Sequence, residues 1–98
     1  MILEHVHITI APERVADYLA AFEQARPLVQ RQPGCNGCRL LPKVGAEGQF
    51  LLLIEWARLE DHTEGFRRSA EYKEWSRLLH QFYDVFPEVN YYSALIER

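Results

Sequence analysis

Histidine is the residue type in this chain that is best suited to acid–base chemistry near neutral pH, and His62 is the strongest candidate. His62 precedes Phe66 by four residues, so both side chains share one face of a helix that begins near Asp61. A helix N-terminus favours the neutral imidazole, which can accept a proton. We therefore predict that His62 is a general base; the alternative is a partly buried histidine that only packs beneath the helix.

Tyr72 and Trp75 lie on one face of the same helical region and could hold a flat aromatic ring. The Tyr72 phenol could donate a hydrogen bond to a substrate oxygen, although core packing explains both residues equally well. Arg67 could bind a substrate oxyanion, but an exposed Arg67 paired with Glu71 is the simpler interpretation. The predicted substrate-binding side chains are Trp56, Phe66, Arg67, Trp75 and Tyr91.

His5 and His7 are two residues apart on one face of a predicted strand, which is a spacing that metal sites use. No Cys, Asp or Glu is spaced to complete such a site, and Glu4 points to the opposite face. We therefore expect polar packing or hydrogen bonding within the sheet, and no bound metal. His80 lies off the apolar stripe of its helix and is predicted to be solvated.

Cys35 and Cys38 form a C-x-x-C motif at the start of a predicted strand rather than at a helix N-terminus. Residues three apart on a strand point to opposite faces, so a disulfide would require a bulge at Gly37. We predict two small packing residues in a reducing compartment.

The elements that must position these residues follow from period-2 and period-3.6 apolar patterns. Two helical regions are predicted, one from Pro12 to Pro33-Gly34 and one from Asp61 to Pro87 with a bend near Ser69. The predicted strands are Ile2–Ile10, Cys35–Leu41, Gln49–Ala57 and Val89–Ile96. The order β-α-β-β-α-β predicts an α+β, ferredoxin-like fold, a four-stranded antiparallel sheet with both helices on one face.

The second face of such a sheet has no helix to cover it. Depending on register, this face carries Leu51 or Leu53, and the surrounding run Phe50–Ile54 suits a strand that is buried on both faces. Leaving such a face in water exposes more apolar area than monomers usually do. We therefore predict a homodimer that pairs through the open sheet face.

Composition limits the possible partners. The 98 residues suit one domain, residues 1–98, and 11 Lys and Arg against 14 Asp and Glu give a net charge of -3 without a basic face. Nucleic acid is therefore an unexpected partner. The longest apolar run, Phe50–Ile54, is too short to span a bilayer, so we expect a soluble, cytoplasmic protein with no membrane association.

The segment Trp56–His62, followed by Phe66-Arg67 and then by Ser69, Tyr72 and Trp75, resembles the antibiotic biosynthesis monooxygenase (ABM) family. Gln32-Pro33-Gly34 at the first helix end is similar as well. The resemblance covers nearly the whole chain and implies a dimeric α+β barrel. The family includes cofactor-free oxygenases of polyketide and quinol substrates, haem-degrading enzymes and an isomerase of a signalling sugar, so the fold alone does not name the reaction.

The haem-degrading branch fits poorly. The resemblance places its haem-ligand histidine at Trp75, its first-strand asparagine at Val6 and the tryptophan that presses on the porphyrin at Gly65. The ligand and both supporting residues are therefore missing from this chain.

The resemblance and the residues together predict a cofactor-independent monooxygenase that oxidises a small phenolic, quinol or polyketide-like metabolite with O2. His62 would act as base and Tyr72 as hydrogen-bond donor, with neither metal nor flavin. A dimer that binds a small aromatic molecule without transforming it is the alternative. An isomerase of a small phosphorylated or keto compound ranks last, because only Arg67 or Arg39 could supply a cation.

Overall fold

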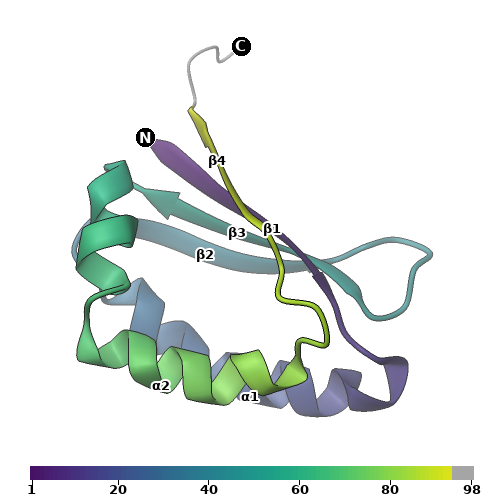
Figure 1. The fold of residues 1–98 in the computed structure, drawn as a ribbon. Coiled ribbons are helices and arrows are strands. Elements are labelled where there is room, and N and C mark those ends of the chain that lie inside the picture. Colours follow the sequence, from purple (N-terminus) through teal and green to yellow (C-terminus); the bar gives the residue numbers. More distant parts are fainter. Residues whose placement is uncertain (94–98) are drawn as a thin grey trace.

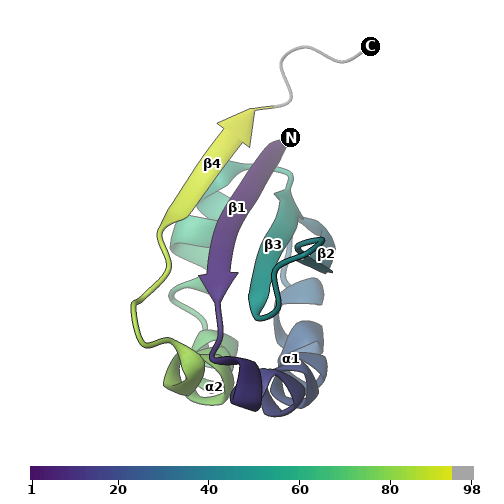
Figure 2. The same cartoon turned by 90° about the vertical axis from the view of Figure 1, so that its right-hand side faces the viewer.

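A four-stranded antiparallel sheet and two helices form the two layers of the computed structural model, which describes residues 1–93 (Figures 1 and 2). The strand order is β2-β3-β1-β4, and both helices lie on one face of the sheet. This arrangement confirms the predicted ferredoxin-like fold. The strands are β1 (Ile2–Thr9), β2 (Cys35–Pro42), β3 (Gln49–Trp56) and β4 (Val89–Ser93).

The helical layer contains α1 (Val15–Gln30) and α2 (Ala70–Leu79), with short 3-10 helices η1 (Pro12–Arg14) and η3 (His80–Phe82). Between β3 and α2 lies a π-helix, η2 (Asp61–Phe66). The predicted bend near Ser69 is the boundary between η2 and α2, where the Ser69 hydroxyl accepts a hydrogen bond from the Tyr72 amide at 3.2 Å. No helix within residues 1–93 is long and apolar enough to cross a membrane.

Strand β3 lies at the centre of the sheet and shows why the core forms on one side. Its alternate residues Phe50, Leu52, Ile54 and Trp56 are buried against the helices. Leu51 and Leu53 face the other way and are half-buried within the single chain, so burial on both faces is not complete here. The sheet thus has an inner face under the helices and an outer face without them.

The last strand begins at Val89, as predicted, and agrees with the prediction over the described residues. β4 runs from Val89 to Ser93 and pairs with β1. Positions 94–96 of the predicted strand lie outside the described residues.

A β-bulge changes the expected geometry of the two cysteines. Cys35 pairs with Trp56 and Cys38 with Ile54, and the register shifts between Cys35 and Gly37. The extra residue turns both cysteines toward the inner face instead of opposite faces. Both thiols are free and pack against the core, as predicted for packing residues.

A tight turn fixes the position of η2 against the sheet. Asp61 was predicted to cap the second helix, but its carboxylate accepts a hydrogen bond from the Arg58 amide at 3.0 Å, in the turn before η2. Gly34 has φ +85° and its carbonyl accepts a hydrogen bond from the Ala57 amide at 2.7 Å. A Cβ atom at Gly34 would overlap the Asp61 carboxylate. The close approach of Gly34 therefore anchors the start of η2.

We expect Gly34→Ala to lower the free energy of unfolding by roughly 2–3 kcal/mol, from left-handed backbone strain plus the displaced Asp61 hydrogen bond. Gly45→Ala is the matched control, because Gly45 has φ +79° with nothing within 4 Å of an added Cβ. The control should cost only about 1 kcal/mol. Urea unfolding of the two variants measures the difference, and equal costs would contradict the role of the Asp61 contact.

Candidate active site

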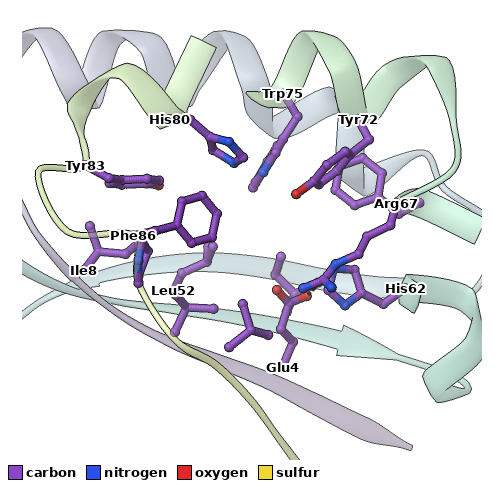
Figure 3. A pocket seen from close by; sticks show the side chains of 15 residues that line it. Glu4, Ile8, Leu52, His62, Arg67, Tyr72, Trp75, His80, Tyr83 and Phe86 are labelled. Carbon is purple, nitrogen blue, oxygen red and sulfur yellow. Dashed lines mark ion pairs between the residues drawn. The ribbon is translucent and has the colours of Figure 1, made fainter. Parts of the chain in front are cut away.

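A pocket lies between the inner face of the sheet and α2, beneath the segment that joins η3 to β4 (Figure 3). The pocket is narrow, with a cavity volume of about 50 Å³. A flat ligand therefore needs side chains at the mouth to shift. The lining residues are Glu4, Val6, Ile8, Leu52, Ile54, His62, Phe66, Arg67, Tyr72, Trp75, His80, Tyr83, Phe86, Pro87 and Val89.

The two ends of the pocket differ in chemistry. Glu4, His62, Arg67 and Tyr72 gather at one end, whereas hydrocarbon and aromatic side chains fill the other end (Figure 3). Such a pocket can orient a ligand that has a polar edge and a flat apolar body.

Glu4 is the buried acid of the polar end. It lies on β1 with 4% of its surface exposed, and its Oε1 atom accepts a hydrogen bond from the Trp56 indole at 2.9 Å. Burial raises the pKa of Glu4 to about 7, against the lowering effects of the Trp56 hydrogen bond and the Arg67 charge. Glu4 therefore changes its protonation state near neutral pH.

His62 faces Glu4 from η2. Its Nε2 atom lies 3.5 Å from Glu4 Oε1, and its Nδ1 atom lies 2.6 Å from the Tyr91 hydroxyl. The imidazole stacks on the Trp56 indole with ring centroids 5.3 Å apart. Burial and the Arg67 charge lower the pKa of His62 to about 4, so the ring is neutral at physiological pH.

The π-helix explains how these side chains reach the pocket. The Arg67 amide donates to the His62 carbonyl at 3.0 Å, an i to i+5 bond that widens the turn. His62 and Phe66 are both buried against the sheet, as predicted. Arg67 then also lines the pocket.

Arg67 is exposed, as predicted, but the predicted pairing with Glu71 is wrong. Within residues 1–93 no ion pair joins them; Glu71 instead receives a hydrogen bond from Gln32 at 3.4 Å. The spacing rule for an α-helix fails here because η2 ends at Phe66 and α2 begins at Ala70. Arg67 reaches toward Glu4 and His62 instead (Figure 3).

Tyr72, Trp75 and Phe66 line the pocket, as the sequence indicated. Trp56 and Tyr91 were predicted as walls too, but neither is part of the lining. Both residues instead form hydrogen bonds with lining residues: Trp56 with Glu4, and Tyr91 with His62.

Sequence reasoning missed several lining residues. His80 was predicted to be solvated, yet it is half-buried with its ring centroid 4.8 Å from that of Phe86, and burial lowers its pKa. Glu4 was placed on the correct strand face but given no role. The signal was present, because Glu4 is the one charged residue in an alternating row with Ile2, Val6 and Ile8.

His5 and His7 lie on the outer face, away from the pocket, with ring centroids 5.0 Å apart. Tyr92 packs on His5 at 5.3 Å, which agrees with the predicted packing role. No three His, Cys, Asp or Glu side chains in residues 1–93 lie close enough together to hold a metal ion.

Comparisons with known proteins extend this picture. An uncharacterized Bacillus subtilis protein, YczJ, is 40% identical over 92 residues, which make up 94% of this chain and 97% of YczJ. A structure from Bordetella bronchiseptica superposes with a TM-score of 0.89 at 33% identity and covers 97% of each chain. Its own assignment as an antibiotic biosynthesis monooxygenase is provisional.

The fold also matches that of SnoaB, a cofactor-independent oxygenase from Streptomyces nogalater, with a TM-score of 0.83 at 15% identity. The match covers 98% of this chain and 94% of SnoaB. The family model described as antibiotic biosynthesis monooxygenase matches residues 1–78. The chain therefore belongs to the antibiotic biosynthesis monooxygenase (ABM) family.

Proposed function

We propose that this protein oxidises a small phenolic, quinol or polyketide-like metabolite with O2, using neither metal nor flavin. The observation that carries the proposal is a narrow pocket that combines aromatic walls with a buried, proton-accepting end at Glu4 and His62. Two findings support it: the chain belongs to the ABM family, and its fold is similar to that of SnoaB, a cofactor-independent oxygenase.

The chemistry requires an electron-rich anion in a dry site. Loss of a proton makes a phenol or enol a better reductant, and its anion can pass one electron to O2. Glu4 and His62 form the polar end of the pocket, where that proton is taken up. Arg67 would balance the charge of the anion, and Tyr72 would donate a hydrogen bond to its oxygen.

Tyr72 suits this donor role because its hydroxyl has no hydrogen-bond partner within residues 1–93 and points into the pocket (Figure 3). The ring also packs edge-on against Phe66, with centroids 5.2 Å apart. The ring is therefore fixed by packing, while the hydroxyl is free for a ligand.

We expect Tyr72→Phe to lower kcat/KM for oxygen uptake by roughly 10-fold to 100-fold, because one hydrogen bond to a developing anion is lost while the ring remains. The measurement uses an oxygen electrode with anthrone, menadiol and simple hydroquinones, and with no added metal or flavin.

Tyr92→Phe is the matched control, because Tyr92 is 53% exposed on the outer face of the sheet and lies outside the pocket lining. It should keep kcat/KM within about twofold. Oxygen uptake by the wild type at the blank rate with every substrate, together with saturable quenching of tryptophan fluorescence, would replace the oxygenase with a binding protein.

We also propose that the protein is a homodimer through the outer face of the sheet. Leu51 and Leu53 are half-buried there, Tyr92 is 53% exposed, and no helix of residues 1–93 covers them. Burying this face against its copy across a two-fold axis removes apolar surface from water.

We expect Leu53→Glu to convert the dimer to a monomer, because two glutamates would face each other across the apolar interface. Val44→Glu is the control, since Val44 is 97% exposed in the β2–β3 loop. Light scattering after size exclusion gives the mass. A Leu53→Glu protein that stays dimeric, with a native circular dichroism spectrum, would refute this interface.

A further inference from the structure

The two oxygen atoms of Glu4 have different surroundings. Oε1 receives the Trp56 indole proton at 2.9 Å and faces His62 Nε2 at 3.5 Å. Oε2 has no hydrogen-bond partner within residues 1–93, and it is not among the fully enclosed unpaired polar atoms of that region. Because Glu4 lines the pocket, Oε2 borders its open space. One carboxylate oxygen is thus held by protein and the other faces a ligand.

His62 has no comparable free atom. Its Nδ1 is engaged by the Tyr91 hydroxyl at 2.6 Å, and its Nε2 faces Glu4. The ring stacks on the Trp56 indole, with ring centroids 5.3 Å apart. Both nitrogens are therefore directed at protein groups, which leaves neither in position to take a proton from a ligand in the pocket.

We propose that Glu4 Oε2 is the base of this pocket, that His62 is a positioning residue, and that the site abstracts a proton from the α-carbon of a flat cyclic ketone even without O2. The proposal rests on the proposed function, because the resulting enolate is the electron-rich anion that oxygenation consumes. It replaces the sequence-based assignment of His62 as base.

The proposed reaction transfers one proton from the α-carbon of the ketone to Glu4. The α-carbon–hydrogen bond breaks, and the proton goes to Glu4 Oε2. The electron pair of that bond forms the carbon–carbon double bond, while the carbonyl oxygen becomes the enolate oxygen beside Arg67 and the Tyr72 hydroxyl. Return of a proton from Glu4 regenerates the ketone, so exchange with solvent deuterium reports the step.

The pH dependence separates the two candidate bases. The titratable or charged groups around Glu4 are His62, Arg67, Tyr72, Tyr91 and the Cys35 and Cys38 thiols. With its pKa raised by burial to about 7, a Glu4 base gives a rate that climbs with pH and levels off above neutrality. With its pKa lowered to about 4, a His62 base would already be deprotonated at pH 6 and would give a flat profile above that.

The experiment follows exchange of the α-protons of 2-tetralone, a flat bicyclic ketone, by proton NMR in D2O under nitrogen. We expect Glu4→Gln to lower the exchange rate about 100-fold or more, since general base catalysis contributes 10²–10⁴. Wild-type exchange should be about 100-fold slower at two pH units below the Glu4 pKa than at its plateau. Glu47→Gln, which removes a carboxylate from the exposed β2–β3 loop, should behave as wild type.

His62→Gln should slow exchange by less than about tenfold and keep the rise toward neutral pH, as expected for a positioning residue. The proposal is overturned by wild-type exchange no faster than buffer, by wild-type rates in Glu4→Gln, or by a profile that is flat above pH 6. Exchange that depends on Glu4 but is not accompanied by oxygen uptake would refute only the proposed oxygenase function. Oxygen uptake that persists in Glu4→Gln and is lost in His62→Gln would refute only the assignment of Glu4 as the base.

Discussion

The hydrogen bond from the Trp56 indole to the Glu4 carboxyl keeps an ionisable group inside the core. In the β1–β3 register Ile2 opposes Trp56 and Glu4 opposes Ile54, so Glu4 and Trp56 are diagonal neighbours on the inner face of the sheet. Without a partner, the buried carboxyl would cost several kcal/mol. With it, the carboxyl is held at a fixed place beneath η2. His62 then stacks on the same indole and faces the same carboxyl.

The second constraint is the break in helical geometry between β3 and α2. A continuous α-helix from Asp61 would turn Arg67 toward Glu71, whereas the wider turn of η2 and the new start at Ser69 bring Arg67 to the pocket. The turn of Gly34 against Asp61 fixes where η2 begins. The polar end of the pocket is therefore built at an irregular part of the backbone, while regular strands and α2 form its apolar walls.

The predictability of each feature depends on how local its cause is. The order of elements, the Ser69 cap and the inward faces of His62, Phe66, Tyr72 and Trp75 follow from short-range patterns. No short-range sequence pattern indicates the π-helix, so the predicted pairing of Arg67 with Glu71 was wrong. The supporting roles of Trp56 and Tyr91 depend on strand register across the sheet, which sequence spacing does not contain.

Glu4 and His62 affect the free energy of unfolding in opposite directions between about pH 4.5 and 6.5. The pKa of Glu4 is raised from 4.5 to about 7, so the fold loses stability as pH rises between these values. The pKa of His62 is lowered from 6.5 to about 4, so the fold loses stability as pH falls between those. Each pKa shift corresponds to roughly 3 kcal/mol of unfolding free energy. Over the pH range that the two shifts share, the free energy changes with pH in opposite directions for the two residues. Between about pH 4.5 and 6.5 the pair's combined effect on the free energy of unfolding therefore changes little, whereas between 6.5 and 7 only the Glu4 contribution still falls as pH rises, so proton loss from Glu4 near neutral pH draws on the stability of the rest of the core.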